Sequence, residues 1–138
     1  MSNSCERRLE ELTSLIDRLA KENSKGVPII VEGKKDALTL QKLGITGRII
    51  CVKASRKPLY DFLDEICEGS EIIILTDFDR RGAQLSHTIT QYLQGLNAGP
   101  NLHFWREIGS LIRRDVKDVE GLASYIEKLK SMTRDRQI

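Results

Sequence analysis

The sequence predicts an α/β fold, with a parallel sheet of about four strands, helices on both of its faces and an additional helix at the N-terminus. Short runs rich in isoleucine and valine alternate along the chain with helical stretches. The runs lack an apolar–polar alternation, which suits strands that are covered on both faces. Strands that alternate with helices imply right-handed crossovers and a parallel sheet. The 138 residues provide for one domain with a substantial core.

The first helix is expected over residues 5–22. Leu9, Leu12, Ile16 and Leu19 follow one another at spacings of three and four, which places them in one apolar stripe. The turn-forming residues 23–26 end this helix. We assign residues 1–26 to an N-terminal helical extension. The sequence leaves open whether the stripe packs on the domain, forms a homodimer or contacts another protein, or belongs to a mobile extension.

The remaining elements follow from the apolar pattern. Strands are expected at residues 28–31, 48–52 and 71–76, with a weaker fourth strand at 101–105. Helices are expected at residues 34–43, 57–68, 82–97, 105–114 and 118–130. The domain therefore spans residues 27–131, and residues 132–138 are left as a C-terminal tail. Tyr60, Tyr92 and Tyr125 fall within these helices and are interpreted as packing residues.

Composition excludes several classes of protein. No apolar run approaches the ~18 residues that a membrane span requires. The charged N-terminus lacks the apolar segment of a signal peptide, so a cytoplasmic location is expected. The three cysteines are odd in number and have no CxxC spacing, which argues against a disulfide framework and a zinc site. The net charge of +2 does not by itself identify a nucleic-acid-binding protein.

Acidic residues directly follow two of the predicted strands. Glu32 follows the first strand, and Asp77 and Asp79 follow the third. Ligands of open parallel sheets bind beyond the carboxyl ends of the strands. Two residues apart on an extended segment, Asp77 and Asp79 project to the same side, and Glu32 faces them if the first and third strands are neighbours. Since converging carboxylates repel one another unless a cation joins them, we predict a Mg²⁺ site here, with Mn²⁺ as an alternative ion.

Each of these residues also has a simpler interpretation. Asp79 suits the N-cap of the helix that follows, Asp36 suits a first-turn acid, and Glu32 alone suits a solvated loop. The combination of Glu-Gly after one buried strand and Asp-x-Asp-x-x-Gly after another favours a functional site. Gly33 and Gly82 are expected to let the backbone approach a phosphate and to adopt unusual turn dihedrals.

Basic residues gather at the same predicted edge of the sheet, and the candidates for nucleic-acid binding are Lys34, Lys35, Lys53, Arg56, Arg80 and Arg81. Scattered cations usually belong to a solvated surface. Cations collected around a metal site in a nearly neutral chain instead suit a polyanion, RNA or DNA, whose phosphates reach the metal. Phe104 and Trp105 either offer a stacking surface for an unpaired base or pack as the end of a strand.

The two acid-bearing segments, residues 30–36 and 75–82, resemble the two motifs of the Toprim domain. Topoisomerases, bacterial-type primases, OLD-family nucleases, recombination proteins and the ribosomal RNA maturase ribonuclease M5 share this domain. The resemblance covers about residues 27–110 and is greatest to small stand-alone Toprim proteins. The sequence of residues 31–36 most resembles that of ribonuclease M5. It implies a Rossmann-like fold, with Glu32 as general acid/base that also contributes to metal binding, and Asp77 and Asp79 as Mg²⁺ ligands.

Two departures limit what the resemblance implies. Arg81 stands where topoisomerases carry a further acid, and because a cation there opposes a second metal ion, we expect one tight metal site. Phe78 stands where a small residue or proline is common, and we expect it to pack under the acidic loop that contains it. Without a candidate nucleophilic tyrosine or a zinc module, a complete topoisomerase or primase is not expected. The leading hypothesis is a Mg²⁺-dependent nuclease, a hydrolase acting on RNA or DNA. The alternative is a non-catalytic nucleic-acid-binding subunit of a larger RNA- or DNA-processing complex.

Overall fold

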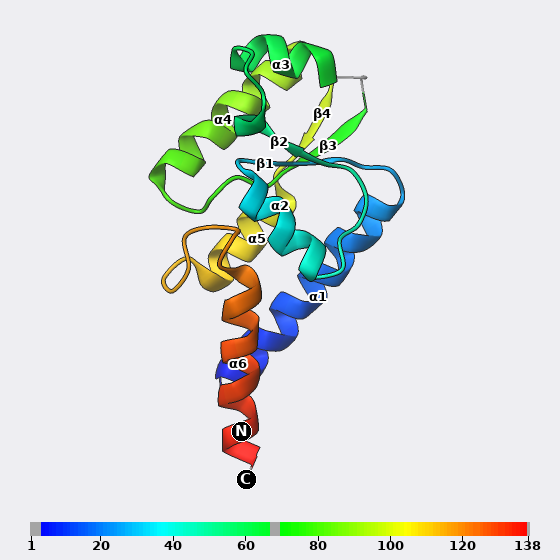
Figure 1. Cartoon of the computed structure of the whole chain (residues 1–138). Helices are drawn as coiled ribbons and strands as arrows, with labels where there is room; N and C mark the ends of the chain where they lie inside the picture. Colours follow the sequence, from blue (N-terminus) through cyan, green and yellow to red (C-terminus); the bar gives the residue numbers. More distant parts are fainter. Residues whose placement is uncertain (1–3, 67–69, 138) are drawn as a thin grey trace.

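A computed structural model describes residues 4–66 and 70–137 of the chain (Figure 1). The sheet has four strands, β1 Ile29–Val31, β2 Ile49–Cys51, β3 Glu71–Ile74 and β4 Gly99–Asn101. All pairs are parallel, and the spatial order is β2-β1-β3-β4. The predicted α/β class and the four-stranded parallel sheet are confirmed. Because β1 lies between β2 and β3, the crossovers diverge between β1 and β3, where a ligand site is expected.

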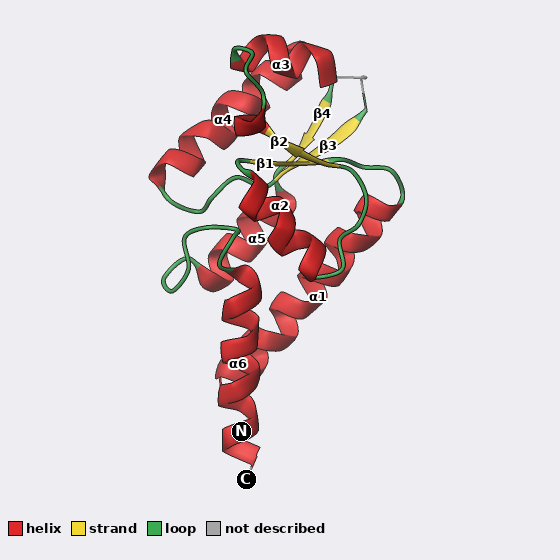
Figure 2. Cartoon of the chain, in the orientation of Figure 1, coloured by secondary structure: helices red, strands yellow, loops and turns green. Residues whose placement is uncertain are grey.

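Six helices surround this sheet: α1 Ser4–Ser24, α2 Lys34–Lys42, α3 Leu59–Ile66, α4 Arg80–Gly95, α5 His103–Ile112 and α6 Leu122–Gln137. They cover both faces of the sheet (Figure 2). One face, through residues such as Ile30 and Ile74, packs on Leu63 of α3 and Ile89 of α4. The other face packs on α1, α2, α5 and α6. Successive side chains of a strand point to opposite faces, so the continuous apolar runs supply both clusters.

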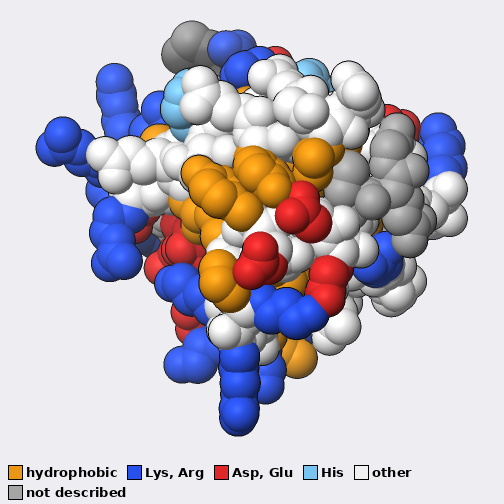
Figure 3. All heavy atoms as spheres, turned by 90° about the horizontal axis from the view of Figure 1, so that it is seen from above, with side chains coloured by type: hydrophobic (Ala, Val, Ile, Leu, Met, Phe, Trp, Pro, Cys, Tyr) orange, Lys and Arg blue, Asp and Glu red, His pale blue; other side chains and the backbone are white. Residues whose placement is uncertain are grey.

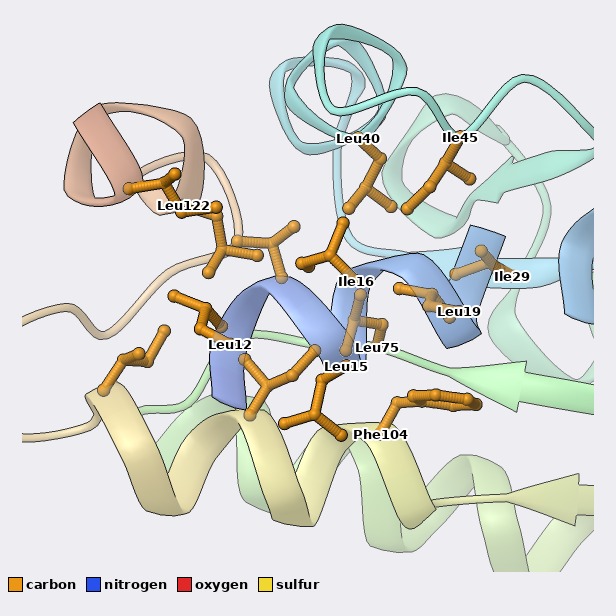
Figure 4. Close-up of a cluster of buried hydrophobic side chains, with 14 of the residues drawn as sticks. Leu12, Leu15, Ile16, Leu19, Ile29, Leu40, Ile45, Leu75, Phe104 and Leu122 are labelled. Carbon is orange, nitrogen blue, oxygen red and sulfur yellow. The ribbon is translucent and has the colours of Figure 1, made fainter. Parts of the chain in front are cut away.

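The N-terminal helix α1 contributes to the larger of these two cores. Leu12, Ile16 and Leu19 are buried in one cluster with Phe104 of α5 and Leu122 of α6 (Figure 4). The apolar stripe predicted from the sequence therefore packs within its own chain. A contact between α1 and a second chain would have to use the polar faces of the helix.

Helices α1 and α6 run side by side away from the sheet, and both chain ends lie at their far end (Figure 1). Helix α6 includes residues 132–137 of the expected C-terminal tail. Residues 67 and 68 of the predicted third helix lie outside the described residues. None of the helices in the described ranges has the length and apolar content to cross a membrane.

A fourth strand is present, as predicted, but it lies at Gly99–Asn101, and its predicted position at residues 101–105 is wrong. Strand β4 ends at Asn101, whose Oδ1 accepts a hydrogen bond from the backbone amide of His103 at the start of α5 (2.8 Å). Phe104 then begins a helical stripe with Ile108 and Ile112, all buried. The spacing of four among these residues is helical, and it outweighs the local preference of the aromatic residues for a strand.

Candidate metal and nucleic-acid site

The carboxyl ends of β1 and β3 bring Glu32 to Asp77. Oε2 of the buried Glu32 accepts a hydrogen bond from the backbone amide of Asp77 at 2.8 Å. Oε1 of Glu32 lies 3.4 Å from Nζ of Lys53, and the backbone amide of Lys53 donates to the carbonyl oxygen of Glu32 at 2.9 Å. The expected adjacency of the first and third strands is confirmed, and it holds the Glu32 carboxylate in a defined orientation between an amide and an ammonium group.

Asp77 occupies an environment that disfavours its charge. Burial raises the pKa of its carboxyl to about 7, and the negative charges of Glu32, Asp36 and Asp118 act in the same direction. The backbone amide of Val119 opposes this shift by donating to Oδ1 at 3.1 Å. A carboxyl group with a pKa near neutrality can exchange its proton for a cation at physiological pH.

Asp79 is the N-cap residue of α4. Its Oδ1 accepts a hydrogen bond from the backbone amide of Gly82 at 2.7 Å, so the simpler interpretation of this residue as a cap applies. The hydroxyl of Thr76 donates to the carbonyl oxygen of Gly82 at 2.8 Å. A Cβ atom at position 82 would overlap with the carbonyl oxygen of Asp77. Glycine is therefore required at this position because α4 packs directly on the backbone that carries Asp77.

Neither site glycine has an unusual backbone conformation, so that expectation is wrong. Gly33 caps α2 with extended dihedrals (φ −136°), and Gly82 lies within α4. Among the described residues, the glycines with a left-handed φ are Gly26, before β1, and Gly44, after α2. A Cβ at Gly33 would meet only Oδ2 of Asp36 at an ordinary 3.8 Å.

Asp36 is more than a first-turn acid of α2, because it also connects this helix to a distant segment of the site. Its Oδ2 accepts a hydrogen bond from the amide of Gly33 and its Oδ1 accepts one from the amide of Glu120, both at 3.0 Å. The side chain is buried, and this burial raises its pKa. The bond to Gly33 is a local capping pattern that spacing alone can suggest. The bond to Glu120 spans 84 residues and has no sequence signal.

Residues 115–121, here called the 115–121 loop, belong to the segment between α5 and α6 and pack against the acidic site. The backbone amide of Phe78 donates to the carbonyl oxygen of Lys117 at 2.7 Å. Phe78 is buried, and its ring stacks with Trp105 at a centroid distance of 6.3 Å. Nε1 of Trp105 donates to the carbonyl oxygen of Asp77 at 3.2 Å, so the tryptophan supports the acidic segment instead of ending a strand.

A cleft of about 430 Å³ opens at this edge of the sheet, lined by Gly33, Lys34, Lys35, Asp36, Lys53, Ala54, Asp77, Asp118 and Glu120. Three of the predicted nucleic-acid-binding residues, Lys34, Lys35 and Lys53, thus lie beside Asp77. Arg56, Arg80 and Arg81 are exposed but do not line this cleft. The cleft is lined by both acids and exposed lysines, an arrangement that suits a cation together with a phosphate.

Comparison with known proteins identifies the family to which this chain belongs. The family model of the Toprim domain matches residues 27–106, which include both acidic segments and the whole sheet. The chain belongs to the Toprim family. Toprim domains typically bind divalent metal ions such as Mg²⁺ and act in metal-dependent processing of nucleic acids.

The similarity of this Toprim protein to known proteins extends beyond the matched residues. A UPF0292 protein of Methanosarcina acetivorans is 38% identical over 128 residues, which cover 92% of this chain and 88% of that protein. A UPF0292 protein of Thermococcus sibiricus is 39% identical over 123 residues, or 89% of this chain and 94% of that protein. A solved structure, a putative protein from Aquifex aeolicus, superimposes with a TM-score of 0.64 at 25% identity and covers 78% of this chain and 94% of that one.

The side chains of this Toprim site suit a divalent ion in their chemistry. Across residues 4–66 and 70–137, no group of three or more His, Cys, Asp or Glu is gathered closely enough to hold a metal. Mg²⁺ nevertheless takes only one or two protein carboxylates in many sites and leaves its other positions to water and phosphate. A cation at Asp77 would also relieve the repulsion that Glu32, Asp36 and Asp118 impose on its carboxylate.

The tyrosines of this Toprim protein lie outside the cleft. Tyr60 of α3 packs on Tyr92 of α4, with ring centroids 4.3 Å apart, but it is 50% exposed and lies outside the core. The hydroxyl of Tyr92 donates to Asp64 at 2.6 Å. The face over α3 and α4 carries a hydrophobic area flanked by acidic side chains (Figure 3). Tyr125 is buried, as expected.

Proposed function

We propose that this Toprim protein is a Mg²⁺-dependent nuclease that hydrolyses phosphodiester bonds in RNA or DNA. The observation that carries the proposal is the hydrogen-bonded pair of Glu32 and Asp77 at the rim of a lysine-lined cleft. Asp77 and Asp79 would hold the ion, with a contribution from Glu32. Bound there, the ion would neutralise charge that develops on the phosphoryl group and would favour the formation of a hydroxide nucleophile from water.

Glu32 is assigned the role of general acid/base. Its two carboxylate oxygens are held by the Asp77 amide and the Lys53 ammonium group, which orients the side chain before a substrate arrives. The carboxylate would accept a proton from the attacking water or return one to the leaving oxygen. The Lys53 side chain is 66% exposed, so its ammonium group would be accessible to a substrate phosphate while it lies next to Glu32.

The basic residues would bind the nucleic-acid backbone. Lys34 and Lys35 begin α2, whose N-terminal amides and dipole also favour a phosphate. Arg80 and Arg81 begin α4 and are exposed, as is Arg56 in the segment between β2 and α3. Such contacts recognise phosphates and do not read sequence, so the specificity of this nuclease would come from the shape of its substrate.

The substitution Glu32→Gln tests the proposal. Glutamine keeps an oxygen that can accept the Asp77 amide, but it cannot transfer a proton. We expect cleavage of end-labelled RNA or DNA, single- or double-stranded, to fall by about 10²- to 10⁴-fold in Mg²⁺ while binding persists. Glu127→Gln on α6 is a matched control, because Glu127 forms an ion pair with Lys130 (3.5 Å) and does not line the cleft. Cleavage by Glu32→Gln at the wild-type rate would refute the role of Glu32.

A second function, non-catalytic binding of nucleic acid within a larger processing complex, has a specific observation in its favour. One oxygen of Asp79 already caps α4, and in the described residues no three ligands converge on one point. This function predicts that the wild-type protein binds the same labelled substrates without cleaving any of them in Mg²⁺ or Mn²⁺. Glu32→Gln would then leave binding unchanged.

A further inference from the structure

The 115–121 loop is attached to the rest of the molecule at both of its ends. At the first end, Oδ2 of Asp115 accepts hydrogen bonds from Nη1 of Arg8 at 3.0 Å and from the hydroxyl of Tyr125 at 2.8 Å. At the other end, the amide of Val119 donates to Asp77. The loop therefore connects the N-terminal helix α1 and helix α6 to the acidic cleft. It also lies outside residues 27–106, which match the Toprim family model.

Two side chains of helix α2 bind the backbone amide and the backbone carbonyl group of Glu120. The hydroxyl of the buried Thr39 donates to the carbonyl oxygen of Glu120 at 2.9 Å, and Oδ1 of Asp36 accepts the Glu120 amide at 3.0 Å. A threonine within a helix usually bonds to a carbonyl of its own helix. Thr39 is instead used for a contact 81 residues away along the chain, which places the neighbouring Val119 amide against Asp77.

The contact between Thr39 and Glu120 affects the metal site because it positions the amide that donates to the Asp77 side chain. Among the described residues, the Val119 amide is the group that donates a hydrogen bond to the Asp77 side chain, and it reaches only Oδ1. An amide donor favours the charged carboxylate and fixes its rotamer. If the loop moved away, Asp77 would lose both its orientation and this compensation for its charge.

We propose that Thr39 is a positioning residue for the metal site, which holds the 115–121 loop so that the Val119 amide prepares Asp77 for a divalent ion. This inference rests on the metal site of the proposed function. It assigns a part in that site to a segment beyond the family match. It also gives the N-terminal helix a role, because Arg8 of α1 holds the same loop at Asp115.

The test compares Thr39→Val with Thr39→Ser in the full chain. Valine keeps the shape of threonine without the hydroxyl, and serine keeps the hydroxyl. Binding of Mn²⁺ is measured by electron paramagnetic resonance of the free ion, and its site by paramagnetic broadening of amide signals. Losing a hydrogen bond that organises the site should weaken Mn²⁺ binding by about threefold to tenfold in Thr39→Val. Thr39→Ser should bind within twofold of the wild type, and thermal melting verifies that each variant is folded.

The outcomes separate this inference from the proposed function. Wild-type binding that broadens Asp77 and the loop amides, weakened in Thr39→Val and restored in Thr39→Ser, supports the inference. Equal binding by all three proteins refutes the role of Thr39 and leaves the proposed function intact. No Mn²⁺ binding by the wild type at millimolar concentration refutes both. If Thr39→Val does not fold, Thr39→Ala takes its place in the same comparison with the same expected loss.

Discussion

Glu32 and Asp77, 45 residues apart in the sequence, are joined by a hydrogen bond of 2.8 Å from the backbone amide of Asp77 to Oε2 of Glu32. The bond crosses from the end of β1 to the end of β3, which are adjacent strands of the sheet. It brings one acidic side chain next to a second that is half-buried and has a pKa near 7. The charge of Asp77 therefore depends on pH near neutrality.

The raised pKa of Asp77 predicts how stability changes with pH in the metal-free protein. The folded pKa is about 7 and the ordinary value is 3.8, so between these values the folded protein holds a proton that the unfolded chain has released. The free energy of unfolding should therefore fall as the pH rises from about 4 to about 7 and then level off. Urea unfolding followed by the fluorescence of Trp105, the single tryptophan, measures this slope.

Asp77→Asn should flatten this part of the pH profile. Asp36, whose pKa is also raised, leaves a smaller slope of the same sign. Asp17→Asn, on the exposed surface of α1, is the control and should keep the wild-type slope. An Asp77→Asn profile that is identical to that of the wild type would contradict the assigned pKa.

Two glycines of α4 predict opposite effects of the same substitution. Gly82→Ala should destabilise the protein by about 3 kcal/mol, because the added methyl group overlaps with the carbonyl oxygen of Asp77. Gly95→Ala should be neutral or stabilise by up to about 1 kcal/mol, since the new Cβ meets no atom within 4 Å and alanine favours the helix. Urea denaturation of both variants measures the difference, and equal effects would show that α4 does not pack on the Asp77 backbone.

Asn23 predicts how strongly α1 is connected to the sheet. Its Nδ2 donates to the carbonyl oxygens of Val27 and Arg48, each at 3.0 Å, and its Oδ1 accepts the Gly47 amide at 2.7 Å. Asn23→Ala leaves these three backbone groups without their partner and should cost about 2–4 kcal/mol. Ser24→Ala, an exposed neighbour, should change the free energy of unfolding by less than about 0.5 kcal/mol. A cost below 1 kcal/mol for Asn23→Ala would show that these three hydrogen bonds contribute little, and that α1 is held mainly by its buried apolar side chains.

The lysines of the cleft predict a change in the salt dependence of nucleic-acid binding. Replacing Lys34 and Lys35 with alanine removes two candidate phosphate contacts, so the slope of log K against log salt concentration should become shallower by about 1 to 2. Replacing Lys128 and Lys130 of α6 removes the same charge elsewhere and should leave most of the slope. Fluorescence anisotropy with labelled oligonucleotides measures both, and equal slopes would place the binding surface outside the cleft.

The acidic site could be located from the sequence because its acids directly follow buried strands. The apolar runs before Glu32 and Asp77 are long enough to predict strands, and parallel strands end at one edge of a sheet. Residues 101–105 misled the prediction because aromatic residues suit both a strand and a buried helix face. Pro100 in β4 is compatible with an edge strand, where a missing amide does not interrupt the sheet.

The sequence by itself determined the α/β class, the parallel sheet and the position of the acids, because these follow from local hydrophobic periodicity and from short motifs. Tertiary structure alone decided which groups complete the site. The amides of Val119 and Glu120 reach Asp77 and Asp36 across 42 and 84 residues of the chain. Every residue except proline has such an amide, so no residue type marks the ones that matter, and only the packing of the 115–121 loop on α2 selects them.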